Sequence, residues 1–228
     1  MTRIGTFEFP PTTIVDSQTE FVLGRVRRIL RLTTFLTRYA SKAEFRQSMA
    51  DLEKEIERFD LGATDLSVNA GRFFKGRRRK WSLTKDEDRC LAVGNLEILT
   101  DDRFERSESE NEETFPITSS PQSENLTVAG NWNALPVLTL TATAALVDPV
   151  FTDGTRTLAA TLSLGIGETL ELDAENRTAT KNGSTNVLTS VSGDFIELEP
   201  GTANLQYSDS TPGGPAASLE VRWRDRWV

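Results

Sequence analysis

The 228-residue chain has no histidine, a single cysteine and no long apolar run. The absence of histidine excludes Ser-His-Asp and Cys-His catalysis, the commonest zinc sites, and the usual general base for neutral pH. Carboxylates or lysines can support catalysis without histidine, but no such arrangement stands out here. We therefore expect a protein that is not an enzyme and that holds no metal or cofactor.

The lone Cys90 can form no disulfide within the chain and no thiolate metal cluster. We expect it to be a buried thiol in a strand, as free cysteines often are. No segment approaches the ~18 apolar residues of a membrane helix. The N-terminus, MTRIGTFEFPP, lacks the apolar core of a secretory signal. Synthesis in the cytoplasm without membrane insertion is the expectation.

The net charge of −8 is divided unevenly along the chain. Residues 1–90 hold 18 Lys and Arg against 13 Asp and Glu, a balance of +5, and residues 91–228 hold 8 against 21, a balance of −13. Such polarity suits a part stacked between partners in an assembly, where opposite faces meet opposite potentials. It equally suits two unrelated domains, so charge alone does not decide between these interpretations.

The clearest helix is expected over residues 41–60. Ser41 with Glu44 three residues later is a capping box. Apolar residues then recur every three or four positions and form one stripe, while residues 53–55, 57 and 58 cover the remaining faces. The helix should pack on a sheet of its own domain through the stripe Phe45, Met49, Leu52, Ile56 and Phe59. Before it, residues 21–23 and 26–32 are expected to pair as a hairpin.

A basic run with aromatic residues follows the helix, and it is the candidate interface of the chain. Phosphate contacts plus stacking would suit nucleic acid, but the acidic net charge argues against dedicated nucleic-acid binding. The other interpretations are a solvated hairpin with Gly76 at its tip, or a docking face for an acidic partner. We favour a projecting hairpin that contacts a neighbouring subunit or the adjoining component of an assembly. Its candidate residues are Arg72, Phe73, Phe74, Lys75, Arg77, Arg78, Arg79, Lys80 and Trp81.

The segment 101–113 carries seven acidic residues and two arginines. It is too polar to bury, so an exposed loop or a sheet edge is expected. A calcium loop is disfavoured because the run has no glycine for the bend. The Ser- and Pro-containing cluster at 118–123 reads as a linker. We therefore divide the chain into domains 1–122 and 123–228.

Short strands separated by turn residues fill the second domain, which predicts an all-β sandwich. In Leu170–Glu171–Leu172 the leucines should face inward and Glu171 outward. Another short strand is expected over residues 195–198. The acids of this region sit on turns or outward positions, and nothing marks the paired carboxylates that glycoside hydrolysis needs.

Four segments together carry a family resemblance: GNWNALPVLTLT (130–141), GETLELDAENRTATKNG (167–183), GDFIELEPGTANLQY (193–207) and the terminal LEVRWRDRWV (219–228). With the helix-containing β-rich first part, they resemble the distal tail proteins of phages with long, non-contractile tails. The resemblance is most specific over residues 126–228. Over residues 1–115 it rests on element order and the helix.

The resemblance implies a mainly β structural protein of the virion tail tip, assembled in the host cytoplasm. A β-rich ring domain with one helix would precede a galectin-like sandwich. The chain would form a homo-oligomer, typically a hexamer, that joins the tail tube protein to a tail-associated or fibre-hub protein. DNA would pass through the ring without sequence-specific binding.

A carbohydrate-binding module for adhesion to the host surface is the alternative. The sandwich could bind a sugar if an exposed tryptophan stacked on a pyranose ring beside polar side chains. The candidates are Asn131, Trp132 and Asn133, in a turn. Galectins also use a histidine in the sugar site, and this chain has none.

Overall fold

The computed structural model describes residues 2–22, 25–37, 39–62, 65–100 and 103–228. The chain divides into two compact units, residues 1–108 together with Val228, and Ser109–Trp227. Each unit buries its own cluster of apolar side chains. Each therefore has the core of an independent domain.

A four-stranded antiparallel sheet in the order β3-β4-β8-β7 is the framework of the first unit. Its strands are β3 (Ile14–Val22), β4 (Arg25–Leu36), β7 (Gly76–Asp86) and β8 (Leu91–Thr100). The predicted pairing of residues 21–23 with 26–32 is confirmed in the β3–β4 hairpin. Its expected residue Leu23 lies outside the described residues. Along β8, buried and exposed side chains alternate, which means that only one face of the sheet is covered.

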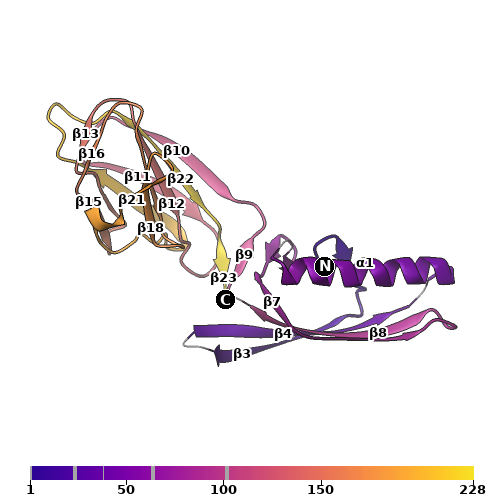
Figure 1. Ribbon diagram of the computed structural model, residues 1–228. Coiled ribbons are helices and arrows are strands. Elements are labelled where there is room, and N and C mark those ends of the chain that lie inside the picture. Colours follow the sequence, from indigo (N-terminus) through magenta and orange to yellow (C-terminus); the bar gives the residue numbers. More distant parts are fainter. Residues whose placement is uncertain (1, 23–24, 38, 63–64, 101–102) are drawn as a thin grey trace. The chain divides into compact units, whose positions relative to one another are not determined.

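The helix α1 (Lys42–Asp60) lies along the covered face (Figure 1). The Glu44 N–H donates to Ser41 Oγ at 3.2 Å, and the Glu44 carboxylate accepts from the Ala40 N–H at 2.8 Å. The helix ends before Gly62, which has a φ of +70°. The predicted helix and its stripe are confirmed, because five apolar side chains are at most 1% exposed: Phe45, Met49, Leu52, Ile56 and Phe59.

Glu55 departs from the sequence prediction, which placed it on a solvent face of the helix. It is only 4% exposed. The N-terminal hairpin of β1 (Arg3–Ile4) and β2 (Phe7–Glu8) contacts α1 on this side. Glu55 Oε1 accepts hydrogen bonds from Thr6 Oγ1 at 3.1 Å and from the Arg58 guanidinium at 2.7 Å. Helical periodicity identifies the main apolar stripe but not a second element packed beside it.

Shorter strands complete the first unit. β5 (Leu66–Ser67) pairs with β1, and β6 (Arg72–Phe73) pairs with β9 (Glu105–Ser107). Glu105 belongs to the acidic segment that we expected to be exposed, yet it is 4% exposed. Two hydrogen bonds from the Asn69 side chain, at 2.7 and 2.9 Å, stabilise its buried carboxylate.

Cys90 is also placed differently from the prediction. It lies in the turn between β7 and β8 rather than in a strand, with a φ of 52°. Its side chain is half-buried and packs against the core of the first unit. Cys90 occupies a turn position that requires a positive φ, and the composition of the chain does not reveal such a requirement.

The second unit is a β-sandwich of two antiparallel sheets, as predicted. One sheet has the order β10-β22-β12-β17-β18-β19 and the other β11-β21-β14-β15-β20. The first consists of β10 (Asn111–Ile117), β22 (Ala217–Trp223), β12 (Val137–Ala142), β17 (Thr169–Asp173), β18 (Thr178–Lys181) and β19 (Thr185–Asn186). The second consists of β11 (Gln122–Val128), β21 (Gly201–Ser208), β14 (Val150–Thr152), β15 (Thr157–Ala160) and β20 (Val191–Gly193).

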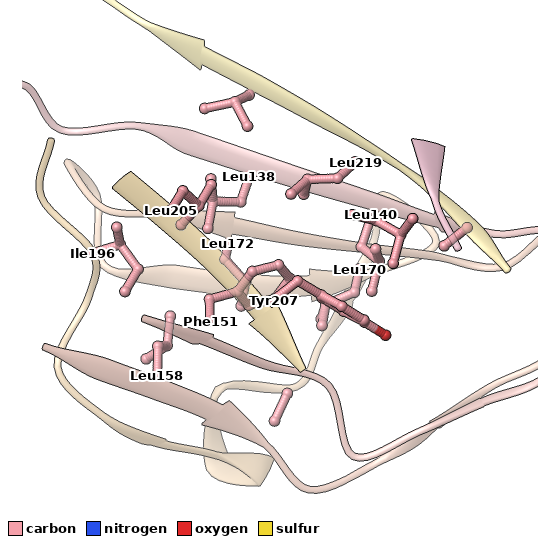
Figure 2. Packing of buried hydrophobic residues seen from close by; sticks show 14 of the residues in the cluster. Leu138, Leu140, Phe151, Leu158, Leu170, Leu172, Ile196, Leu205, Tyr207 and Leu219 are labelled. Carbon is pink, nitrogen blue, oxygen red and sulfur yellow. The ribbon is translucent and has the colours of Figure 1, made fainter. Parts of the chain in front are cut away.

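Smaller elements lie between and after these strands. They are the pair β13 (Leu146–Val147) and β16 (Ser163–Leu164), the 3₁₀ turn η1 (Leu188–Ser190), and β23 (Arg226–Trp227). The predicted alternation is confirmed in β17, where Leu170 and Leu172 are 0% and 2% exposed and Glu171 is half-buried. Leu170 and Leu172 meet apolar side chains of the other sheet, including Phe151 and Tyr207 (Figure 2). The rings of Phe151 and Tyr207 pack edge to face.

The structure settles one feature of the sandwich that the sequence left open, and it corrects another. The segment from Leu219 to Trp223 lies within β22, between β10 and β12. The strand expected over residues 195–198 is absent, and only Leu198 forms a bridge, to Ala134. The Glu197 N–H instead donates to Asp153 Oδ2 at 3.2 Å. A side-chain acceptor thus replaces the strand ladder here.

The division between the units falls after Glu108, whereas the sequence suggested a division between residues 122 and 123. The difference arises from β10, which pairs with β22 from Asn111 to Ile117. Because of this pairing, the end of the acidic segment lies at a sheet edge. A sheet edge was one of the two expectations for this segment, the other being an exposed loop. The linker-like composition at 118–123 instead marks the turn between β10 and β11.

Candidate functional site

The basic run Arg72–Trp81 does not form the projecting hairpin with Gly76 at its tip. Gly76 begins β7, which continues to Asp86, and the turn lies at residues 87–90. A Cβ atom at Gly76 would approach the Leu99 carbonyl oxygen to 2.5 Å. The glycine is thus required for the close approach of two strands. In the sequence alone, such a glycine looks like a turn residue.

The aromatic residues of the run are not available for stacking. Phe73 and Phe74 are 5% and 1% exposed, and Trp81 is half-buried against the core of the first unit. The Arg28 guanidinium lies 5.6 Å from the Phe74 ring centroid. The expectation that these aromatic side chains take part in an interface is therefore wrong for Phe73 and Phe74.

Two central arginines of the run bind acidic side chains of the same unit. Arg78 forms an ion pair with Asp60 at 2.7 Å, and its N–H also donates to that carboxylate at 2.9 Å. Arg79 forms an ion pair with Glu97 on β8 at 3.2 Å. These contacts help to hold β7 against the end of α1 and against β8.

The other cations of the run comprise one that lies near an acidic side chain and three that are exposed. Arg72 lies 3.6 Å from the Glu105 carboxylate. Lys75, Arg77 and Lys80 are exposed, and the last two stand on β7, at the edge of the sheet. Three of the nine candidate residues are thus exposed cations on or beside one edge strand, and their part in an interface stays a prediction.

The sheet β3-β4-β8-β7 has two open edges, β3 and β7, among the residues that the structure describes. Each pairing in it is antiparallel, so these two strands run in opposite directions. Open edges of this length present rows of backbone donors and acceptors that can pair with another chain. Sequence reasoning missed this feature because an edge is a property of strand order.

The face of this sheet opposite α1 carries a connected polar network at its centre. Arg31 donates to Gln18 at 2.9 Å and lies 3.5 Å from Glu97. Beside it, the Thr33 hydroxyl donates to Asn95 Oδ1 at 3.2 Å. The face therefore presents both charges with their partners in place, a surface that water can cover.

One end of the same sheet exposes apolar side chains. Phe35 on β4 and Val93 on β8 are register partners and are 44% and 37% exposed. Ile14 and Leu91 are 60% and 36% exposed. Exposed apolar side chains of this size mark a surface suited to protein contacts.

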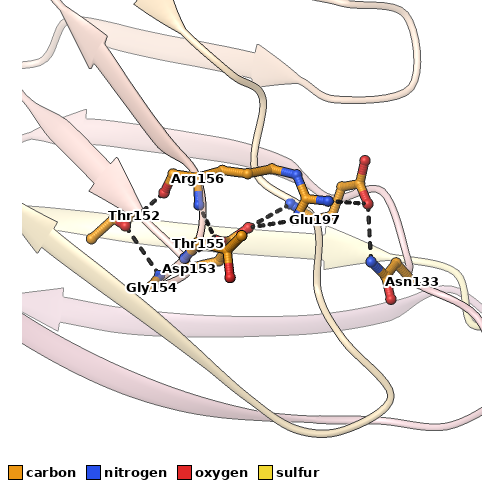
Figure 3. A network of polar contacts seen from close by, with 7 residues as sticks. All are labelled: Asn133, Thr152, Asp153, Gly154, Thr155, Arg156 and Glu197. Atoms are coloured by element: carbon orange, nitrogen blue, oxygen red, sulfur yellow. Dashed lines mark hydrogen bonds and ion pairs between the residues drawn. The ribbon is translucent and has the colours of Figure 1, made fainter.

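In the second unit, Trp132 of the sugar-binding candidate is 43% exposed. The backbone N–H groups of Asn131 and Trp132 donate to the Arg226 carbonyl at 3.1 and 3.3 Å. The Asn133 side chain donates to Glu197 Oε2 at 3.0 Å (Figure 3). The structure brings the three residues together, but the Asn133 amide is already used within the protein.

The same network is centred on Asp153 and Arg156 (Figure 3). Asp153 accepts backbone N–H bonds from Thr155 at 2.8 Å and from Arg156 at 2.6 Å, in addition to that from Glu197. Burial raises the pKa of Asp153, but the backbone donors and the Arg156 side chain outweigh this effect and the pKa is lowered. Arg156 also bonds Glu197 at 2.9 Å, so these charges serve to fix the loops.

Glu168 is another acid held by local contacts. Its carboxylate bonds Lys181 at 2.6 Å, the Gly165 N–H at 2.7 Å and the Asn182 side chain at 3.2 Å. These partners, with Lys181 the strongest, lower the pKa of Glu168 to about 2. A carboxylate so stabilised in its charged form is poorly suited to general acid catalysis.

Within the described part of the chain, no group of three or more Asp, Glu or Cys side chains could hold a metal ion. No helix among these residues has the length and hydropathy that crossing a membrane requires.

Comparison with known proteins gives a family match and a similar fold. Residues 129–227 match the model of the siphovirus-type tail component, C-terminal domain. Over its full length the chain is similar to the crystal structure of the SPP1 Dit (gp 19.1) protein, described as a paradigm of hub adsorption apparatus in phages infecting Gram-positive bacteria. The TM-score is 0.62 at 12% identity, with 92% of that chain covered. No curated protein sequence matches the chain.

The two findings concern different extents of the chain. The family match covers most of the sandwich but leaves out β10 and β11, and it includes the segments that carried the sequence resemblance. The structural similarity extends to the first unit and shows its fold. Residues 129–227 are thus similar to the C-terminal domain of siphovirus-type tail components, and the resemblance of the chain to the distal tail proteins of phages with long, non-contractile tails is confirmed.

Proposed function

We propose that this tail component forms a closed ring, through the first unit, that joins the tail tube to the hub at the tail tip. The observation that carries the proposal is the open antiparallel sheet with edges β3 and β7 running in opposite directions. When β7 of one copy pairs with β3 of the next, the antiparallel alternation continues across the junction. Each copy repeats the same junction, and a rotation between neighbours that closes after a whole number of copies joins the sheets into a barrel.

Six copies, the number that the family resemblance implies, would give a barrel of about 24 strands. With strands about 4.8 Å apart and tilted by about 40°, its backbone diameter is on the order of 45 Å. Side chains on the inner face reduce this by about 10 Å. The remaining bore would admit a DNA duplex.

In this arrangement α1 covers the outside and the polar face with Arg31, Gln18 and Glu97 lines the bore. Because Arg31 and Glu97 lie near each other, the lining has no strong field of one sign at its centre. DNA would then pass without being retained, because tight phosphate binding requires an excess of cations. No sequence-specific contact is required.

The stacking partners would meet the two ends of the barrel. The exposed apolar end with Ile14, Phe35 and Val93 offers a surface for the tail tube protein or for a tail-associated, fibre-hub protein. The sandwich, as a galectin-like domain, would decorate the outside of the ring. A position at the tail tip is supported by the description of SPP1 Dit as a paradigm of hub adsorption apparatus. The chain would accordingly be located at the virion tail tip after assembly in the host cytoplasm.

Cross-linking between the two edges tests the ring directly. In a Cys90→Ser background, Asp16→Cys on β3 and Ser82→Cys on β7 place one thiol near each edge, on exposed positions. A short bismaleimide should convert the double variant into a covalent ladder that ends at the closed ring. Each single-cysteine variant should stop at a dimer at most.

Negative-stain microscopy of the uncross-linked protein should show rings with a central hole. A double variant that remains monomeric, together with a wild type that shows no rings even when the tail tube protein is added, would contradict the proposal. Gln47 is exposed on α1, and the helix is not expected at the junction. Gln47→Cys is therefore a matched control.

Charge reversal tests the basic edge. Arg77, Arg78 and Arg79 together, changed to Glu, should block ring assembly or tail joining. Since Arg78 and Arg79 bind Asp60 and Glu97, the triple variant also removes contacts of the fold. The single change Arg77→Glu is therefore the cleaner probe, and it should weaken assembly while leaving the melting temperature unchanged. Normal rings from this variant would remove Arg77 from the interface.

A second candidate function is sugar binding by the sandwich, which the exposure of Trp132 favours. Stacking on Trp132 would be lost in Trp132→Ala. A glycan array should then show hits for the wild type that disappear in the variant. An array without hits would exclude this function for the sugars presented.

A further inference from the structure

One row of side chains on the polar face of the β3-β4-β8-β7 sheet alternates in charge from one edge to the other. Asp16 on β3 is the register partner of Arg31 on β4, and Arg31 is in turn the partner of Glu97 on β8. Glu97 has Lys80 on β7 as its other register partner. Side chains of register partners project from the same face of a sheet, and Arg31, Glu97 and Lys80 also line one pocket there. The row thus runs negative, positive, negative and positive across the four strands.

The two inner charges of this row have partners within the unit, whereas the two outer charges have none among the described residues. Arg31 lies 3.5 Å from the Glu97 carboxylate, which also binds Arg79 at 3.2 Å. Asp16 and Lys80 are exposed, and neither side chain forms an ion pair or a hydrogen bond with another part of the chain that the structure describes. Each stands on an edge strand, so the row presents an anion at one edge of the sheet and a cation at the other.

The two edges are therefore complementary in charge at the same level of the sheet. Opposite charges on neighbouring strands stabilise a sheet, and like charges destabilise it. Where β7 of one copy lies beside β3 of the next, Lys80 can meet Asp16 directly opposite or on the diagonal, which a lysine side chain spans. The diagonal allows the offset between copies that a tilted barrel needs. A shift by a single residue would instead turn one of the two charges to the other face.

We propose that Lys80 of one copy forms an ion pair with Asp16 of the next, and that this pair fixes the register of the ring junction. The proposal rests on the ring described above, and it names the β3 edge of a second copy of this chain as the partner of the β7 edge. With the pair in place, the alternation of the row continues from copy to copy. No two like charges of the row then meet at a junction.

Mixing two single variants tests the pair. Asp16→Lys places two cations at the junction, and Lys80→Glu places two anions there. In sedimentation velocity of the full chain, each variant alone should need a protein concentration about tenfold higher than the wild type to assemble. An equimolar mixture should assemble like the wild type, because in a ring of six alternating copies every junction then joins opposite charges. The variant with both changes should also assemble like the wild type.

Matched double variants separate the pair from a general effect of charge. Asp16→Lys with Arg77→Glu has the same net charge as Asp16→Lys with Lys80→Glu, and Arg77 is also an exposed cation on β7. It should not restore assembly, because Arg77 belongs to another row of the sheet. Lys54→Glu with Glu57→Lys reverses two exposed charges of α1 and should leave assembly unchanged.

Neutral variants keep the test valid if a charge reversal fails to fold, which the melting temperature reports. Asp16→Asn and Lys80→Gln should each weaken assembly. The variant with both changes should be no weaker than the weaker single variant, because both changes remove the same contact.

Three results would overturn the proposal. Single reversals that assemble like the wild type would show that the two charges do not meet. Single reversals that neither the mixture nor the double variant restores, or neutral changes whose losses add, would show that each charge has a different partner. In these two cases wild-type rings persist and the ring itself stands. A wild type that forms no rings, even with the tail tube protein added, would remove both the ring and the pair.

Discussion

The change Asp153→Asn removes one charge from the loop network of the sandwich without changing side-chain size. The Asp153 side chain is 7% exposed, and its two oxygens accept from the backbone N–H groups of Thr155, Arg156 and Glu197. An amide can still accept at one oxygen, but its NH₂ group would face the Glu197 N–H and the Arg156 guanidinium, which are both donors. We expect the free energy of unfolding of the second unit to fall by about 2–4 kcal/mol, the range for losing hydrogen bonds to a buried charge.

The assay is urea unfolding of the full chain, with hydrogen exchange of the sandwich amides to assign the transition to the second unit. Asp173→Asn is a matched control. Asp173 accepts from the Glu175 and Asn176 N–H groups at 2.9 Å in a similar turn, but among the described residues it has no ion pair to an arginine. Its substitution should cost about 1 kcal/mol or less, as expected for an exposed turn. Equal losses in the two variants would refute the assignment of stability to the buried network.

The same pair gives a pH dependence with a definite sign. The folded-state pKa of Asp153 is lower than its unfolded value, so its charge contributes stability above the unfolded pKa, about 4. This contribution is lost as the pH falls through the folded-state pKa. The stability difference between wild type and Asp153→Asn should therefore be constant from pH 5 to 7 and should shrink below about pH 4. A difference that does not change down to pH 2 would contradict the linkage.

Two further predictions concern single positions. Gly76→Ala should lower the melting temperature of the first unit, because the new methyl group would meet the Leu99 carbonyl oxygen at 2.5 Å, and an unchanged thermal transition would show that the strands separate at little cost. Carboxyl ¹³C NMR should give Glu168 a pKa of about 2, and Lys181→Met should raise it because the leading cause of the shift is then absent; a normal pKa in the wild type would show that the Lys181 contact is not maintained in solution.

Local patterns in the sequence determined much of the secondary structure. The capping residues Ser41 and Glu44 and a stripe spaced by three and four residues specify α1, because both signals depend only on near neighbours. In the sandwich, alternation and turn residues located β17 and β18 in the same way. The segments of residues 130–228 that resemble distal tail proteins also lie where the family model matches.

The candidate interface could be predicted less well from local sequence patterns. The run from Arg72 to Trp81 has the composition of an exposed hairpin, yet Phe73 and Phe74 are buried. Its arginines Arg78 and Arg79 bind acids 18 residues away in each direction along the chain. Exposure and ion pairing depend on partners that folding supplies, and charge patterns in one segment cannot identify them.

The sequence by itself determined the helix, most strands, the sandwich and the tail-protein resemblance, since each follows from short-range periodicity, turn chemistry or local motifs. Only the tertiary structure decided the division after Glu108, because β10 pairs with β22 about a hundred residues away. It alone also decided the open edges β3 and β7 and the burial of Glu55. Strand order and burial arise from contacts between distant segments, and these contacts place the surfaces on which the proposed functions depend.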